Sequence, residues 1–345
     1  MRQSIVQRAI MAMVLLALGS WAQAQVTYRI EQVGPDPNPP DVYFYFANDL
    51  NDKGEVIGGA YATGPFWAWL WRDGELIRLP ALPNSSDSDY VDASGLNDRT
   101  QIVGSSGSSA VLWQRRQVRD LSTLLGPNAG VTDLNNLGMM IGDVVTNGVG
   151  APMVQWGKHR LMLETLPGAV FTQAVRINEL GVVSGYTTFN YVQNHAVIWT
   201  LGHIRDLGVL PGGYDATAGG INDRGEVTVT VRFNDGSSSR PAVWRRDHLV
   251  ELPLPHYGDY VRGSANSINN AGTVVGSFFD GLTGEATALV WQHGAVYNLN
   301  DLIRADDPLR LSAQLQQAAT INNRGQILAL GAGNRNLLLT PSGHL

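Results

Sequence analysis

One five-residue phrase recurs seven times along the chain, and this repetition constrains the fold more than any other feature. Each copy places an asparagine after a leucine or isoleucine, and six copies end in glycine. Successive asparagines lie 38 to 53 residues apart. The mean spacing of about 45 residues matches one four-stranded propeller blade. The repeat asparagines are Asn51, Asn97, Asn135, Asn178, Asn222, Asn269 and Asn322.

A second phrase, an apolar strand that ends in tryptophan, follows each of the first six copies. The seventh copy, at residues 337–340, has no tryptophan, as is common in terminal repeats. One tryptophan per repeat, each on a strand, predicts core residues that lie between blades. These tryptophans are Trp71, Trp113, Trp156, Trp199, Trp244 and Trp291.

Each repeat divides into four strands joined by short turns. Asparagine or aspartate followed by glycine is favourable hairpin chemistry, because asparagine bonds nearby backbone and glycine adopts positive φ. The sequence therefore predicts an all-β, seven-bladed β-propeller with four-stranded blades. The last repeat lacks a fourth strand, and the only unassigned apolar strand is at residues 27–33. We expect this N-terminal strand to complete the last blade by pairing with residues 337–340, which would remove open sheet edges.

The N-terminus has the three parts of a signal peptide: a basic start, the apolar run from Ala9 to Leu18, and a small-residue site at Ala22 to Ala24. We expect a signal peptide over residues 1–24, cleavage before Gln25 and a single domain over residues 25–345. The mature protein is then secreted or periplasmic. The apolar run is too short for a comfortable membrane span, and no later stretch is long enough. A monomer is favoured.

The repeats resemble those of the bacterial extracellular HAF-repeat family. The matching segments are Ile177 to Gly185, His195 to Trp199 and Asp206 to Gly213, together with Ile268 to Gly276. The resemblance covers nearly the whole mature chain, although only His195-Ala196 keeps two of the three name-giving residues. It implies an exported, propeller-type repeat protein and carries no catalytic residues to this chain.

Composition excludes several kinds of site. The chain has no cysteine, so thiolate chemistry and cysteine-based metal sites are absent. Its formal charge of −6 argues against nucleic-acid binding. No His-x-x-x-His pattern, Gly-x-Ser-x-Gly elbow or phosphate loop occurs, so we expect neither a metal nor a cofactor. Two arginine doublets, Arg115-Arg116 and Arg245-Arg246, are interpreted as caps of exposed hairpins.

Topology indicates where ligands would bind. The connections from the second to the third strand and from each fourth strand to the next repeat are long and variable, and they lie on one face. Carboxylates and aromatic rings in these loops suit sugar rings or peptides, although such residues also simply build stable loops. The candidates there are Asp87, Asp89, Tyr90, Tyr191, Tyr214, Asp215, Tyr257 and Asp259.

Three further candidates, Asp49, Asp133 and Arg176, stand two residues before a repeat asparagine, on the strand expected to be innermost. Charges near the axis of a propeller bind a ligand or ion, or are merely solvated in a wet channel.

Because propellers serve many functions, the fold does not decide among three classes of protein. The first is a non-enzymatic binding or interaction module for an extracellular or envelope glycan or protein, and the lack of a catalytic motif favours it. The alternatives are an enzyme acting on an extracellular polymer, such as a polysaccharide lyase or hydrolase, and a purely structural envelope protein.

Overall fold

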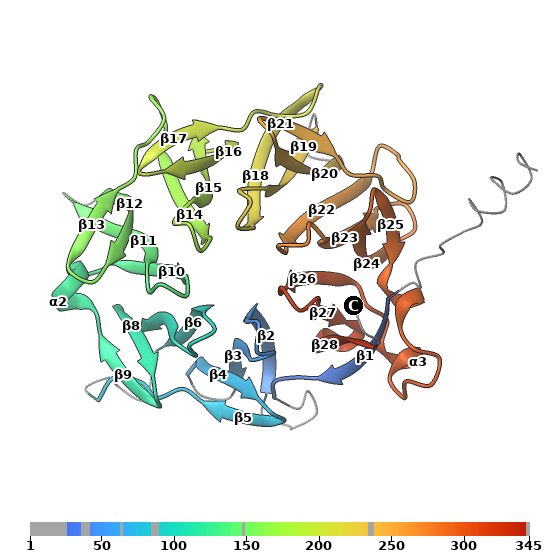
Figure 1. Ribbon diagram of the computed structural model, residues 1–345, viewed down its shortest axis with the longest axis horizontal. Helices are drawn as coiled ribbons and strands as arrows, with labels where there is room; N and C mark the ends of the chain where they lie inside the picture. The colour runs from blue at the N-terminus through green and yellow to red at the C-terminus, as the bar shows by residue number, and fades with distance from the viewer. Residues whose placement is uncertain are drawn as a thin grey trace, which may run out of the picture.

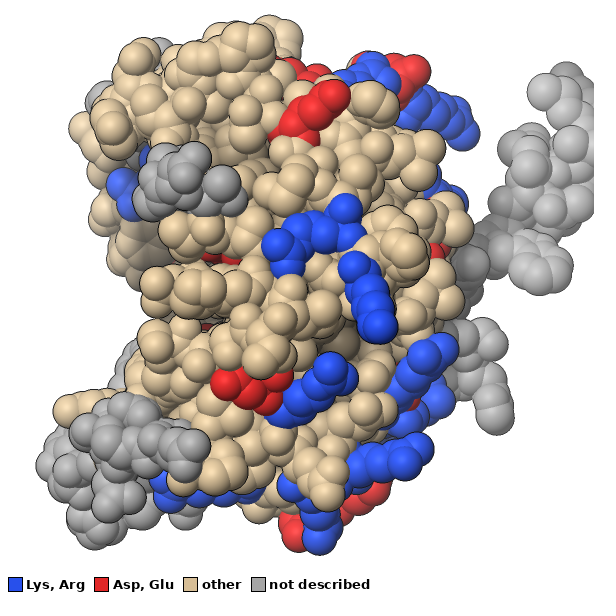
Figure 2. All heavy atoms as spheres, turned by 90° about the vertical axis from the view of Figure 1, so that its left-hand side faces the viewer, with Lys and Arg blue, Asp and Glu red and all other residues tan. Residues whose placement is uncertain are grey.

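The computed structural model describes residues 26–35, 42–62, 65–83, 90–146, 149–233 and 238–342. The expected signal peptide and the cleavage site before Gln25 lie outside these residues. Figure 1 shows the strands arranged as a ring around a central axis. Seen edge-on in Figure 2, Lys and Arg side chains gather toward one of the two faces of this ring.

The strands follow the repeats, four to a unit. The first unit contains β2 (Val42–Leu50), β3 (Val56–Ala62), β4 (Trp67–Arg72) and β5 (Glu75–Arg78). The second contains β6 (Val91–Leu96), β7 (Ile102–Ser106), β8 (Ser109–Gln114) and β9 (Gln117–Asp120), followed by the short helix α2 (Ser122–Leu125). The third contains β10 (Gly130–Leu134), β11 (Met140–Thr146), β12 (Val149–Trp156) and β13 (His159–Met162). The fourth contains β14 (Phe171–Ile177), β15 (Val183–Phe189), β16 (Gln193–Thr200) and β17 (His203–Asp206).

The remaining units follow the same plan. The fifth contains β18 (Gly213–Ile221), β19 (Val227–Phe233), β20 (Ser238–Arg245) and β21 (His248–Glu251). The sixth contains β22 (Val261–Ile268), β23 (Val274–Asp280), β24 (Glu285–Gln292) and β25 (Ala295–Asn298), followed by η1 (Leu299–Leu302) and α3 (Arg310–Ala313). The last contains β26 (Gln317–Ile321), β27 (Ile327–Gly331), η2 (Ala332–Asn334), β28 (Arg335–Ser342) and the N-terminal strand β1 (Thr27–Gln32).

Within the described residues, these strands form five separate four-stranded antiparallel sheets and one eight-stranded sheet. The expectation of seven separate four-stranded blades is therefore wrong as stated, whereas the all-β propeller with four-stranded antiparallel blades is confirmed. The physical reason is a link between the fifth and sixth units. A single parallel residue pair, Ser239 with Arg262, joins β20 to β22, and the Ser239 hydroxyl donates a hydrogen bond to the carbonyl of Gly263 at 3.0 Å.

The N-terminal strand completes the last sheet, as predicted. β1 runs antiparallel to β28 and lies at the end of the order β1-β28-β27-β26. Ile30 faces Leu339 across the ladder, and Tyr28, only 1% exposed, packs into the core of this unit. The chain thus closes its ring by joining residues more than 300 positions apart.

The apolar cores lie between neighbouring units, as the repeated tryptophans predict. Trp113, Trp199, Trp244 and Trp291 are all buried in such clusters. The prediction is wrong for Trp156, which is 39% exposed and stacks on His159, and Trp71 is only half-buried.

Trp156 lies outside the core because the neighbouring unit ends differently. The indole N–H of Trp199 donates to the carbonyl of Glu164. Glu164 follows Leu163, which is the first residue after the fourth strand of the preceding unit. Ser122 occupies the equivalent position in the unit that precedes Trp156. Its carbonyl accepts the N–H of Gly126 in the turn of α2 and is not used by the indole of Trp156. Leu125 of that helix fills the apolar cluster instead.

Candidate functional site

The repeat asparagines form a closed ring of hydrogen bonds around the axis. Each side-chain Nδ2 donates to the backbone carbonyl of the next repeat asparagine at 2.8–3.2 Å, and Asn322 closes the circle by donating to Asn51. Each Oδ1 accepts two backbone N–H groups of its own turn, as Asn178 accepts those of Leu180 and Val182. One side chain therefore shapes a turn and also binds the next unit.

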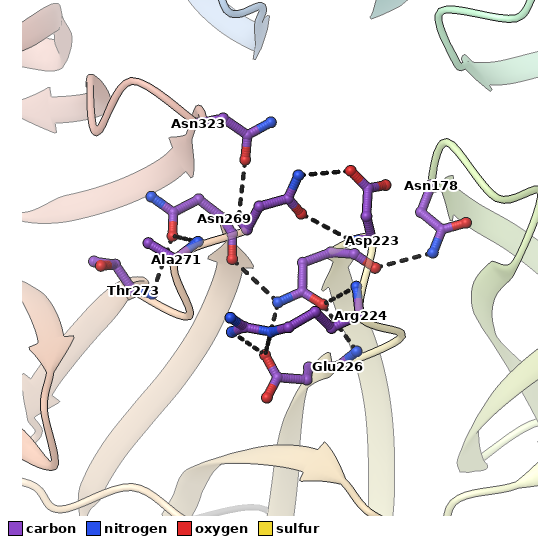
Figure 3. A network of polar contacts seen from close by, with 10 residues as sticks. Asn178, Asp223, Arg224, Glu226, Asn269, Ala271, Thr273 and Asn323 are labelled. Carbon is purple, nitrogen blue, oxygen red and sulfur yellow. Dashed lines mark hydrogen bonds and ion pairs between the residues drawn. The ribbon is translucent and has the colours of Figure 1, made fainter.

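A second ring of hydrogen bonds accompanies the first. The residue after each repeat asparagine has a side-chain oxygen that accepts the backbone N–H of the equivalent residue in the preceding unit, at 2.7–3.0 Å. Figure 3 shows part of both rings around Asp223, Asn178 and Asn269. The sequence analysis did not single out these positions, although all are Asp, Asn or Glu. They are Asp52, Asp98, Asn136, Glu179, Asp223, Asn270 and Asn323.

The three charged candidates from the innermost strands do meet at the axis. Asp49, Asp133 and Arg176 line one cavity of about 180 Å³ together with the asparagine ring. Both carboxylates are buried, and each accepts the N–H of the residue that follows it. The second oxygen of each accepts an N–H of the next unit, from Leu96 for Asp49 and from Ile177 for Asp133, both at 3.0 Å. These carboxylates hold adjacent inner strands together.

Electrostatics in the cavity are dominated by burial. Burial raises the pKa of Asp133 to about 7, although the nearby Arg176 lowers it, and the neighbouring Asp49 raises it further. Burial also raises the pKa of Asp49, again against the effect of Arg176. Among the residues the structure describes, no group of three or more His, Cys, Asp or Glu side chains is placed to hold a metal ion. The carboxylate oxygens of Asp49 and Asp133 already accept backbone N–H groups. Their structural role in joining the inner strands therefore explains why these charges lie in the cavity.

The face formed by the long connections carries exposed aromatic side chains. Tyr90, Tyr191 and Tyr257 are 47%, 85% and 54% exposed. Tyr90 stacks on Phe66 with ring centroids 4.3 Å apart, and Phe66 stacks in turn on Phe46. All three tyrosines are therefore accessible to a ligand, and their role in binding stays a prediction.

The other candidates of this face differ in their surroundings. Asp215 is fully buried: the Arg232 guanidinium donates to both of its oxygens, at 2.6 and 2.7 Å, and Asn194 donates its N–H. Asp215 is therefore a structural residue, contrary to its selection as a ligand-binding one. Asp259 is exposed and Tyr214 is half-buried. Asp87 and Asp89 lie outside the described residues.

Comparisons with known proteins show the fold. A catalytically inactive virginiamycin B lyase from Staphylococcus aureus aligns with a TM-score of 0.54 and 14% identity over 91% of this chain and 99% of that one. A streptogramin B lyase aligns with a TM-score of 0.55 and 11% identity over 92% and 98%. YCF48 from Cyanidioschyzon merolae aligns with a TM-score of 0.55 and 13% identity over 90% and 99%. No family model and no curated protein matches the sequence. Within the described part of the chain, no helix is long and apolar enough to cross a membrane.

Proposed function

We propose that this protein is an exported, non-enzymatic binding module that recognises an extracellular or envelope glycan or protein through its long-loop face. The observation that carries the proposal is the distribution of exposed aromatic side chains. Within the described residues, seven of the eight exposed aromatic side chains belong to the long connections or the strand ends beside them, and the eighth is Trp156. The seven are Tyr61, Tyr90, Phe171, Tyr191, Tyr257, Tyr260 and Phe279.

Exposed aromatic rings on one face favour binding for a physical reason. A tyrosine offers a large apolar surface, a hydroxyl that forms hydrogen bonds, and few rotatable bonds to order on binding. Scattered over a surface such residues need no explanation, whereas their collection on one rim indicates an interaction site. Tyr257 also has the Arg240 guanidinium over its ring at 5.4 Å, which presents a cation beside an aromatic plane.

The architecture and the export route belong to the same proposal. Seven repeat asparagines in one closed hydrogen-bonded circle support a seven-bladed count, in which the eight-stranded sheet consists of two linked blades. The tripartite N-terminus and the resemblance to HAF repeats support secretion or a periplasmic location.

The test is a glycan and peptide array probed with the mature chain. We expect saturable binding without turnover, and we expect the double variant Tyr191→Ala, Tyr257→Ala to weaken it at least tenfold. The control is Leu201→Ala, an 82% exposed apolar residue of a short turn on the opposite face, which should bind like the wild type. Product release would favour the polymer-degrading enzyme, and a blank array would favour the structural protein.

A further inference from the structure

A groove on the outside of the ring lies between the first and second units. It encloses about 580 Å³ and runs between β5 and the hairpin of β8 and β9. This volume falls in the range of sites that hold small ligands. Apolar side chains, among them Leu70, Ile77 and Trp113, form part of its lining. Five arginines also line the groove: Arg72, Arg78, Arg99, Arg115 and Arg116.

The groove has an excess of positive charge. Glu75 is the only acidic residue among its lining residues. Arg72 forms an ion pair with Glu55 at 2.6 Å. In contrast, Arg115 and Arg116 are exposed and form no ion pair with any described residue. The charge of Arg99 acts on the carboxylate of Glu179, so Arg99 is partly compensated. Uncompensated cations gathered in one groove attract anions, even in a chain whose formal charge is −6.

A second groove of the same kind serves as an internal comparison. It lies between the fourth and fifth units and is also lined by arginines, including Arg205, Arg224 and Arg246. Acidic residues of the same groove neutralise two of them. Arg205 pairs with Asp247 and Arg224 pairs with Glu226, each at 2.6 Å. The second groove also holds Arg245 and Arg246, which form no ion pair with a described residue. The first groove is therefore distinguished by its acidic lining, which is Glu75 in place of Glu226 and Asp247.

The turns at the two grooves have the same backbone conformation. Arg115 and Arg116 occupy the turn between β8 and β9 with φ of 52° and 65°, in the left-handed region. In the second groove, Arg246 and Asp247 occupy the turn between β20 and β21 with φ of 50° and 70°. The two turns are therefore matched in geometry and differ in charge.

We propose that this first groove binds an acidic oligosaccharide, with Arg115 and Arg116 as the residues that recognise its charged groups. Arginine matches a carboxylate or another oxyanion in a bidentate geometry. Several cations along one open groove suit a chain that carries repeated anionic groups, and the apolar lining suits the C–H faces of sugar rings. The site is distinct from the long-loop face, because its arginines stand in the short turns and on strands β4 and β5.

The experiment measures binding of the mature chain to uronate-, sulfate- and phosphate-bearing oligosaccharides and to their neutral counterparts. We expect at least one acidic oligosaccharide to bind, its neutral counterpart to fail, and affinity to fall as salt rises. The double variant Arg115→Gln, Arg116→Gln should weaken binding at least tenfold. The matched control is Arg245→Gln with Arg246→Gln in the second groove. It should change the affinity less than about twofold, which is a smaller change than the loss of a charged hydrogen bond would cause.

Two further variants separate the possible outcomes. Arg116→Gly relieves a left-handed backbone, so it should raise the melting temperature while it weakens binding, which excludes unfolding as the cause of the loss. The double variant Tyr191→Ala, Tyr257→Ala should leave this binding unchanged, and that result separates the groove from the long-loop face. Equal losses in both pairs of arginine variants, or no binding of any acidic oligosaccharide, would overturn the proposal.

Discussion

The asparagine ring predicts that a single amide group supports the connection between two units. Replacing Asn178 by alanine removes three hydrogen bonds. The amide donates to the carbonyl of Asn222 at 2.9 Å, and its oxygen accepts the N–H groups of Leu180 and Val182 at 3.1 and 2.8 Å. Asn178 is only 4% exposed, so water cannot fully replace these partners.

The magnitude follows from the number of bonds lost. A net contribution of about 0.5–1.5 kcal/mol for each of the three hydrogen bonds gives a loss of about 1.5–4.5 kcal/mol in the free energy of unfolding. An unfolding entropy of about 2.1 cal/mol/K per residue converts this loss into a decrease of about 2–7 °C in melting temperature.

Equilibrium urea unfolding of Asn178→Ala, checked by thermal melting, measures the effect. A second variant, Asn178→Asp, keeps both acceptor contacts but turns a buried carboxylate oxygen toward the carbonyl of Asn222. Its loss of stability should become smaller at acidic pH, where a protonated carboxyl group can donate to that carbonyl. If Asn178→Ala unfolds within about 0.5 kcal/mol of the wild type with an unchanged urea dependence, the ring does not hold the units together.

Three other predictions follow from the core, the cavity and the closing strand. Trp199→Ala should cost about 3–5 kcal/mol in urea unfolding, whereas Trp156→Ala should cost less than about 1 kcal/mol; similar losses would contradict the assigned burial. Because burial raises the folded-state pKa of Asp133 to about 7, its contribution to stability is complete below about pH 4 and is lost as the pH rises through about 7. Melting temperatures from pH 4 to 8 should therefore fall more for the wild type than for Asp133→Asn, and parallel curves would refute this assignment. The pair Arg29→Cys with Thr340→Cys, directly opposite in the ladder, should form a disulfide on oxidation, whereas failure to crosslink in the folded protein would argue against this register.

The fold could be predicted from sequence where its determinants are local. The turn at each repeat depends on one asparagine side chain and the next few backbone groups, so Asn178 and its counterparts already indicate the strand pattern. The N-terminal closing strand followed from counting strands. The bridge between Ser239 and Arg262 depends on how closely two units approach, and no repeat spacing encodes that distance.

The candidate site could be predicted only in part, because burial depends on partners from other strands. Asp215 is an ordinary loop residue in sequence, and only the register of β18 with β19 places Arg232 opposite it. Trp156 has the same sequence context as Trp199, but α2 occupies the carbonyl that its indole would use. The Arg115-Arg116 doublet could be recognised in the sequence as a hairpin turn. The groove beside it could not be predicted, because residues of the neighbouring unit form its other side.

The pairing of the first and last strands, β1 and β28, determines how the ring responds to force. Thr27 begins β1 and lies opposite Ser342, near the end of β28, and their hydroxyl groups are 2.9 Å apart. A load applied between these two residues therefore acts on one end of an antiparallel pair. The hydrogen bonds between β1 and β28 would then break one after another from that end, and they would not share the load along the strand. A ring held together by many contacts between units would thus open under a comparatively small force applied to this one pair of strands.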